Sequence, residues 1–343
     1  MARVSPPSAS SRSAAQARLR ALAAPAGSLG RLGDLAVWLS SVQGQVPPRH
    51  LGNVRLVVFA GDHGVARHGV SAYPPALTAA MVRTMVQGRA AVNALAAENG
   101  VRLRVLDLGV DADLDDLPLA VRRFKVRRGT RPIHLEDAMT PMETRKALAA
   151  GSAAALDEIA GGAQLLLTGD LGVGNSTPAA ALVGALLGLP GYEVASRGTG
   201  ADEVAAARRT KIIDRALVRA GGRAHDPVDA LAALGGPDLA ATTGFLATAA
   251  EAGVPVLLDG LVSVACAMLA DRMRPGAAAW FVAGHRSTEP AQSFALARLG
   301  LEPVLDLDLR VGDGSGAVAA VPMLRSAGRL LRDVALLSEL ATG

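Results

Sequence analysis

Six short apolar runs alternate along the chain with alanine-rich segments of helical spacing. The runs span 54–60, 103–108, 164–168, 254–258, 279–283 and 304–309, and the helical segments include 77–99, 178–187, 201–220 and 239–252. Strands of a parallel sheet are buried on both faces and read as near-continuous apolar runs, with helices in the crossovers between them. The pattern therefore predicts an α/β fold, with a parallel sheet covered by helices on both faces.

A small or polar motif follows each run. The series is GDHG at 61–64, Gly109, GD at 169–170, DG at 259–260, GH at 284–285 and GDG at 312–314. One such motif is explained equally well as a tight turn, which needs glycine anyway. Six in series favour a ligand site, because ligands of open α/β sheets bind at the carboxyl ends of the strands.

The two ends of the chain carry helical patterns and no strand signal. Residues 14–22, 32–40 and 317–340 have helical spacing, and Pro47-Pro48 form a linker. We therefore expect residues 1–48 and 317–343 to pack together as a small helical subdomain beside a large α/β catalytic domain of residues 49–316.

Composition excludes several classes of protein. Half of the 343 residues are hydrophobic, the net charge is +4, and Cys266 is the single cysteine. Intrinsic disorder and a disulfide-stapled domain are therefore excluded. The mean hydropathy of +0.30 raises the question of a membrane span. However, segment 178–190 is too short to span a bilayer, and 254–270 is interrupted by Asp259 and Gly260.

The sequence also predicts where the protein is located and argues against a nucleic-acid partner. The start of the chain has no apolar signal segment, which predicts a cytoplasmic protein. The charge is weak for a chain of this length, and only 3% of residues are aromatic, so a nucleic-acid partner is not expected.

The strongest single motif is TGDLGVGNSTP at 168–178, which follows a strand and opens a helix. Glycines and a helix N-terminus at such a point suit an anion. Asn175 stands where an NTPase loop needs lysine, and Thr177 where a dinucleotide fingerprint needs its third glycine. A loop for a monophosphate or carboxylate remains. Asp170 inside it would then orient a donor, meet a cationic ring or take a proton; alternatively, it only caps the turn.

Two further loops fit the same chemistry. SRGTGAD at 196–202 precedes Arg208, Arg209 and Lys211, which suit phosphate unless they are simply a solvated helix face. In LRVGDGSGA at 309–317, Asp313 stands between two glycines with little bulk around it, as a general base would require. The alternative for Asp313 is a helix cap.

The sequence gives less support for a metal site or a hydrolase site. Asp62, His63 and His68 offer ligand types without a known zinc spacing. HRSTEP at 285–290 combines His, Ser and Glu in one segment, whereas a hydrolytic triad draws on separate segments, and no nucleophile elbow is present.

Taken together, the motifs resemble the nicotinate-nucleotide–dimethylbenzimidazole phosphoribosyltransferase family, which activates the lower ligand of cobalamin. The resemblance runs from GSLGRL at 27–32 through GDHGVARHGVSAYP at 61–74, TGDLGVGNSTPAAAL at 168–182 and RGTG at 197–200. It continues through PVLLDGLVSVACAMLA at 255–270, HRSTEP at 285–290 and LDLRVGDGSGA at 307–317. It implies a Rossmann-like six-stranded parallel sheet, a small helical domain from both termini and a homodimer.

The resemblance also implies the reaction and the site. Phosphoribosyl would pass from nicotinate mononucleotide to 5,6-dimethylbenzimidazole or a related base, giving α-ribazole 5′-phosphate and nicotinate, without a metal or cofactor. Asp313 matches the family's carboxylate base, and Asp170 a second carboxylate. The residues expected to bind substrate are Ser71, Tyr73, Leu171, Gly172, Gly174, Asn175, Ser176, Arg197, Gly198, Thr199, Gly200, Lys211, Asp259, His285, Ser287, Val311, Gly312, Gly314 and Ser315.

The chain departs from the family pattern at two places. Asp170 and Asp313 stand where the family has glutamates, and Ala80 stands where it often has a glutamine that contacts the acceptor. Both carboxylates are thus one methylene shorter, which suggests closer loops or a bulkier acceptor. Two alternatives remain open: a weakly active or non-catalytic homologue that binds nucleotide as a regulatory or partner subunit, and a nicotinamide-dependent oxidoreductase, against which Thr177 speaks.

Overall fold

The computed structural model describes residues 3–195 and 203–340 and contains a six-stranded, wholly parallel sheet. The strands are β1 (Val54–Gly61), β2 (Val101–Gly109), β3 (Leu165–Leu171), β4 (Val256–Leu258), β5 (Phe281–Arg286) and β6 (Pro303–Asp306), in the order β2-β1-β3-β4-β5-β6. Each lies on one of the six predicted runs, so the predicted α/β fold is confirmed. The chain leaves β1 toward one edge of the sheet and β3 toward the other, so a topological switch point lies between these two strands.

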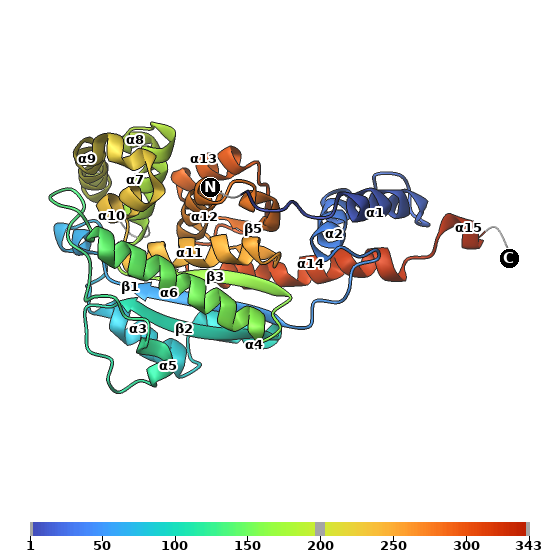
Figure 1. Cartoon of the computed structure of the whole chain (residues 1–343), viewed down its shortest axis with the longest axis horizontal. Helices are drawn as coiled ribbons and strands as arrows, with labels where there is room; N and C mark the ends of the chain where they lie inside the picture. The colour runs from blue at the N-terminus through green and yellow to red at the C-terminus, as the bar shows by residue number, and fades with distance from the viewer. Residues whose placement is uncertain (1–2, 196–202, 341–343) are drawn as a thin grey trace.

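Helices cover both faces of the sheet (Figure 1). On one face, Phe59 of β1 meets Phe245 of α11 (Pro237–Glu251), with ring centroids 5.5 Å apart. Three residues earlier on β1, Leu56 lies against Gly314, at the start of α14 (Ser315–Asp333). Side chains three apart on a strand point to opposite faces. Thus α11 and α14 lie on opposite sides of β1, and each contacts further strands.

The long helix α6 (Pro141–Ala160) packs on α11 at very short range. A Cβ added to Gly151 of α6 would lie 1.8 Å from the carbonyl oxygen of Ala241, and one added to Gly244 of α11 would lie 2.2 Å from that of Leu148. Only glycine allows such backbone contact. No helix was predicted over residues 141–160, although Thr140 and Glu143 form the capping box that marks a helix start.

The segment predicted as one helix over 77–99 is two helices, α3 (Leu77–Val86) and α4 (Ala91–Glu98). The break falls at Gly88, whose φ of +74° lies in the left-handed region that ends helices. The other helices are α5 (Leu119–Arg122), α7 (Ser176–Leu187), α8 (Gly191–Val194), α9 (Glu203–Ala220), α10 (Pro227–Leu234), α12 (Leu261–Met273) and α13 (Pro290–Leu299), with 3-10 turns η1 (Gly64–His68), η2 (Gly221–His225) and η3 (Ala277–Trp280). Among the residues described, no helix combines the length and apolar character needed to cross a bilayer.

Helices from the two ends of the chain pack together at the amino-terminal side of the sheet. Helices α1 (Ala9–Ala21) and α2 (Gly30–Gln43) pack against each other and against α14, and α15 (Leu337–Leu340) lies beyond them (Figure 1). The predicted boundary at residue 317 falls inside α14, whose first turns contact β5 and whose later turns contact α2. The division into two domains stays a prediction.

Candidate active site

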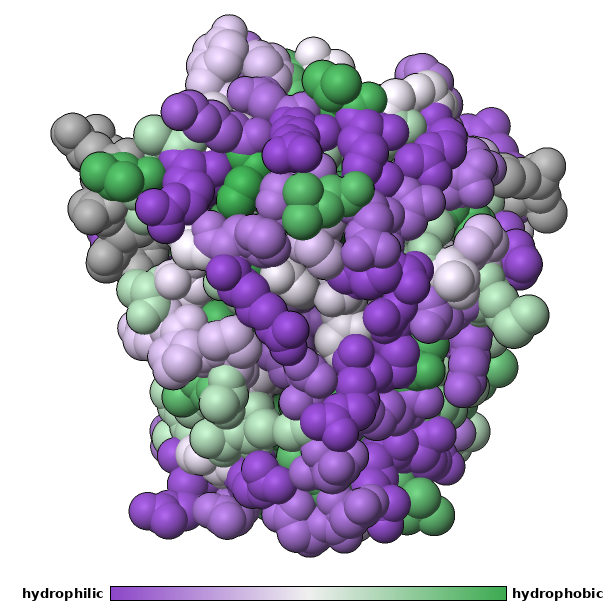
Figure 2. Space-filling model, turned by 90° about the vertical axis from the view of Figure 1, so that its left-hand side faces the viewer, coloured by the Kyte–Doolittle hydropathy of each residue, from purple (hydrophilic) through white to green (hydrophobic). Residues whose placement is uncertain are grey.

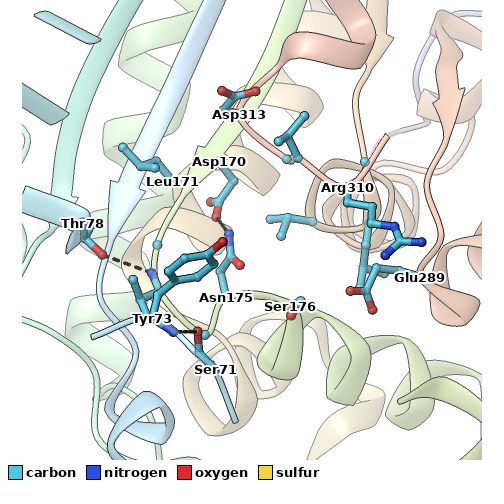
Figure 3. Close-up of a pocket in the computed structure, with 18 of the residues that line it drawn as sticks. Ser71, Tyr73, Thr78, Asp170, Leu171, Asn175, Ser176, Glu289, Arg310 and Asp313 are labelled. Atoms are coloured by element: carbon cyan, nitrogen blue, oxygen red, sulfur yellow. Dashed lines mark hydrogen bonds between the residues drawn. The ribbon is translucent and has the colours of Figure 1, made fainter. Parts of the chain in front are cut away.

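A cavity of about 370 Å³ lies at the carboxyl edge of the sheet, beside the switch point. Its wall comes from six parts of the chain: the loop before α3 and that helix, the end of β3 with the start of α7, Arg209 of α9, residues 260–262 at the start of α12, segment 287–289, and the loop 310–313 before α14. Figure 3 shows these segments converging from different elements. Figure 2 shows this end of the molecule, which is mostly hydrophilic with small separate hydrophobic patches.

Asp170, near the end of β3, and Asp313, on the loop before α14, both line this cavity, and the two segments are joined through the backbone. The amide of Asp170 donates to the carbonyl of Gly312 over 2.8 Å. A Cβ added to Gly169 would lie 2.3 Å from the carbonyl oxygen of Asp313, so the glycine allows the second loop to touch the strand end. The two carboxylates predicted from separate motifs are therefore held on neighbouring backbone.

Asp170 is almost fully buried, at 4% exposure. Its Oδ1 accepts a 2.6 Å hydrogen bond from Nδ2 of Asn175 (Figure 3), and its Oδ2 has no partner among the described residues. Burial, and after it the nearby Asp238 carboxyl, raises the pKa of Asp170 well above its usual range, against the opposing effects of Asn175 and His63. A carboxyl in this environment keeps its proton more readily than a solvated one.

Asp313 is only half-buried. Its Oδ1 accepts from the amide of Ser315 over 3.0 Å. Burial raises the pKa of Asp313, and the Asp259 carboxyl adds to this, while Ser315 lowers it. A modestly raised pKa in a carboxyl that touches the cavity is suited to a general base.

The cavity has an apolar side and a polar side. Leu77, Met81, Met85, Leu171 and Val311 contribute apolar lining. Ser176, Arg209, Ser287, Glu289 and Arg310 contribute polar and charged lining. In Figure 3, Glu289 and Arg310 lie on the opposite side of the view from Tyr73, Thr78 and Leu171. Such a wall fits a ligand with an apolar ring at one end and an anionic group at the other.

Arg209 is the buried cation of the polar side, at 7% exposure. From α9, its Nη2 donates to Oγ of Ser176 over 3.0 Å, and its Nη1 lies 3.9 Å from Oε2 of Glu289. Burial lowers the pKa of Arg209, but an arginine starts so high that it remains charged. Arg310, in contrast, is exposed.

Twelve of the predicted site residues line this cavity: Ser71, Tyr73, Asp170, Leu171, Gly172, Gly174, Asn175, Ser176, Ser287, Val311, Gly312 and Asp313. Arg197, Gly198, Thr199 and Gly200 lie outside the described residues. Ala80 is exposed on α3 and is absent from the lining, which Met81 and Met85 reach from the same helix.

Five predicted residues lie outside the cavity wall. Lys211 is exposed on α9, two residues beyond Arg209. Asp259 accepts from the amides of Gly314 (3.1 Å) and Ala317 (2.8 Å). His285 lies against Gly316, with Nε2 3.4 Å from Oδ1 of Asp259. The amides of Gly314 and Ser315, expected to bind phosphate or ribose, instead donate to Asp259 and Asp313. These contacts hold the start of α14, and with it Asp313, in place.

Several lining residues were missed by sequence reasoning. Thr78 accepts from the amide of Val173 over 3.1 Å and so ties α3 to the loop after β3. Met81 and Met85 have ordinary helical spacing, which carries no functional signal. Arg310 and Glu289 could have been inferred, because both stand inside motifs already singled out. In the described residues, no cluster of three or more His, Cys, Asp or Glu side chains could hold a metal ion.

The fold and the site together define an α/β protein with a cavity at the switch point of a parallel sheet and two carboxyl groups in its wall. The model of a protein family described as phosphoribosyltransferase matches residues 4–341. The chain therefore belongs to this phosphoribosyltransferase family and is an enzyme.

Individual relatives agree with this assignment. The chain is 50% identical over 341 residues to the nicotinate-nucleotide–dimethylbenzimidazole phosphoribosyltransferase of Mycobacterium avium, covering 99% of this chain and 95% of the relative. It is 48% identical over 336 residues to that of Mycobacterium leprae, with 98% and 95% covered. The crystal structure of the enzyme of that name from Thermus thermophilus superposes with a TM-score of 0.92, at 42% identity, over 98% of this chain and 99% of that one.

Proposed function

We propose that this enzyme transfers phosphoribosyl from nicotinate mononucleotide to 5,6-dimethylbenzimidazole or a related base. The products are α-ribazole 5′-phosphate and nicotinate, as in nucleotide-loop assembly of cobalamin. The observation that carries the proposal is the pairing of Asp170, near the end of β3, with Asp313 on the loop that touches it, in a cavity with an apolar side and a cationic side. The names of the relatives support the same reaction.

The reaction needs little from the protein beyond placement and one base. The bond from ribose C1′ to the pyridinium nitrogen breaks, and nicotinate leaves with a neutral ring nitrogen, so no general acid is required. A ring nitrogen of the acceptor bonds to C1′ from the opposite face. Its other nitrogen then loses a proton, which Asp313 accepts, and the same carboxylate stabilises the positive charge that develops on the acceptor ring.

The two sides of the cavity suit the two substrates. Leu77, Met81 and Leu171 offer a surface for the acceptor ring. Arg209, hydrogen-bonded to Ser176, and Arg310 are the cations of the lining, and the phosphate of the nucleotide would bind on this side. Holding both substrates in line across C1′ supplies much of the rate enhancement in such a transfer.

The shortened carboxylates fit this arrangement. The Asp313 loop contacts the end of β3 closely enough to require glycine at position 169. An aspartate on a loop that lies this close can reach the acceptor without the extra methylene of a glutamate.

Incubation of the purified protein with nicotinate mononucleotide and a panel of benzimidazoles and purines tests the proposal. We expect nicotinate release with a benzimidazole acceptor and a strong reduction in Asp313→Asn. Nucleotide binding without release for any acceptor would instead support the non-catalytic alternative. Full activity of Asp313→Asn would move the base to another group.

We also propose a cytoplasmic homodimer. Large apolar side chains are exposed on neighbouring helices: Tyr192 of α8, and Val204 and Val218 of α9, are 72%, 64% and 84% exposed. A second copy of the chain would cover such residues. Sedimentation of the protein and of Val218→Asp tests this: we expect a dimer that weakens in the variant, and a monomeric wild-type protein would contradict it.

A further inference from the structure

Close to Asp170 lies a buried pair of ionisable side chains that the proposed mechanism does not use. His63 follows β1 and Asp238 lies in the first turn of α11. Their side chains are 1% and 0% exposed, and Nε2 of His63 lies 2.8 Å from Oδ2 of Asp238. Asp62, also buried, precedes His63, and its Oδ2 accepts from the amide of Asp111 over 2.8 Å.

Several polar atoms of these buried side chains have no hydrogen-bond partner in the part of the protein that the structure describes. Within the described residues, Oδ2 of Asp170, Oδ1 of Asp238, Nδ1 of His63 and Oδ1 of Asp62 all lack a hydrogen-bond partner. Glycine at position 236 leaves room for the pair, because a Cβ there would lie 2.4 Å from Oδ1 of Asp238 and 2.7 Å from Cε1 of His63. Unsatisfied buried groups gathered at one place are a sign of function, because each is costly.

The charges of the group cannot all be present at once. Three carboxyls, Asp62, Asp170 and Asp238, share the interior with a single imidazole. The 2.8 Å contact pairs the imidazole with Asp238, and Asp170 has only the neutral amide of Asn175 as a direct partner. Like charges that share a dry site cannot all ionise, so one of the carboxyls retains its proton.

We propose that its buried position beside the Asp238 carboxylate, opposed only in part by His63, keeps Asp170 protonated at neutral pH, so that the cavity presents one carboxyl that donates, Asp170, and one that accepts, Asp313. His63 and Asp238 are thus positioning residues that act through Asp170. The proposal rests on the proposed function and deepens it. A neutral Asp170 donates to an oxygen or nitrogen of the bound nucleotide without repelling its negative groups.

The electrostatics of the neighbouring elements agree with this assignment. Burial is the largest effect on His63 and lowers its pKa, but the charge and hydrogen bond of Asp238, with smaller contributions from Asp170 and Asp62, together raise the pKa and favour an imidazolium. Asp238 raises the pKa of Asp170, whereas His63 lowers it. From α12, the Cys266 thiol faces the same group, and burial raises its pKa well above the usual range, so it adds no charge. Burial also raises the pKa of Asp62.

Infrared spectroscopy of the resting enzyme tests the proposal without any substrate. A protonated carboxyl has a carbonyl stretch that a carboxylate lacks. We expect such a band at neutral pH in the wild-type protein and its loss in Asp170→Asn. Absence of a band assignable to Asp170 would overturn the proposal, whatever the activity of the enzyme.

Two nearly isosteric variants then separate an electrostatic role from a structural one. Asp238→Asn removes the charge that raises the pKa of Asp170, so the band should titrate at a pH lower by about one unit or more. His63→Gln removes the charge that lowers this pKa, so the band should titrate at a higher pH. Both variants disturb the same contact, and a purely structural role would shift the titration in the same direction in both.

The pH dependence of kcat/KM provides the matching kinetic test. The alkaline limb should follow Asp170, moving down in pH in Asp238→Asn and up in His63→Gln. Glu158→Gln is the control: it removes a buried carboxyl of α6, paired with Arg55 near the start of β1, and should change neither band nor profile. An infrared band without turnover would reject the proposed function and leave the protonation of Asp170 standing. Turnover with an alkaline limb that neither variant moves would reject the role of the pair.

Discussion

Gly169→Ala perturbs the contact between the end of β3 and the Asp313 loop, which holds the two carboxylates close together. The new Cβ would lie 2.3 Å from the carbonyl oxygen of Asp313, 2.5 Å from its carbon and 2.8 Å from the amide nitrogen of Gly314. All three atoms belong to backbone, so no side chain can rotate away. Restoring a contact of 3.0 Å, below which real Cβ atoms essentially never approach, requires the loop to move by about 0.7 Å.

The displacement translates into a loss of rate. A misplacement of about 1 Å costs on the order of 10²-fold in rate, so we expect kcat to fall by roughly 10- to 100-fold. Overpacking should also destabilise the fold by about 1–3 kcal/mol. Nicotinate release measures the first effect, and thermal unfolding measures the second.

Gly151→Ala is the matched control, because its Cβ would lie 1.8 Å from the carbonyl oxygen of Ala241, at the contact between α6 and α11. It should destabilise the protein at least as much and leave kcat of the folded fraction unchanged. Wild-type kcat in folded Gly169→Ala would refute the argument that this contact places Asp313. An equal loss of kcat in both variants would attribute the effect to stability alone.

Asp313→Glu, which restores the usual family residue, should lower kcat, because the loop already lies close to the cavity; a gain in kcat would instead indicate an impaired site. Arg209→Met should raise KM for nicotinate mononucleotide far more than Lys211→Met, since Arg209 lines the cavity and Lys211 is exposed; steady-state kinetics of the two variants decides between these cations, and a larger effect at Lys211 would contradict the assignment. The folded-state pKa of Asp170 is raised above 3.8, so its contribution to stability is fully present at low pH and is lost as pH rises through the raised value. Relative to the wild type, the Tm of Asp170→Asn should therefore increase as the pH rises from about 4 through the raised pKa of Asp170; a difference in Tm that does not change with pH would contradict this sign.

Much of the fold could be predicted because strands buried on both faces leave a continuous apolar signal. All six strands fall on the predicted runs, within a few residues at their ends. Helices were predicted less completely. The single segment over 77–99 was wrong, because the turn at Gly88 follows from one backbone angle inside an otherwise helical pattern.

The site could be predicted where a motif lies directly at a strand end, as for Asp170 and Asp313. Residues that arrive from elsewhere could not. Asp238 lies at the start of an alanine-rich helix, and only the crossover from α10 to α11 brings it to His63. Asp259 and His285 stand at strand ends, yet both face the start of α14 and not the cavity, because sequence gives no information on which side of a loop faces the ligand.

Helix α14 connects the active site to the terminal helices α1 and α2 as one continuous helix. It has 19 residues and is about 28 Å long at 1.5 Å per residue. Its first turn is fixed to Asp259 beside Asp313, and its far turns are fixed to α2. A rotation of the terminal helices would thus be transmitted along α14 and would displace Asp313. Pro322, inside the helix, has no N–H to offer the carbonyl of Val318, so we expect α14 to bend most easily at this position, between its two ends.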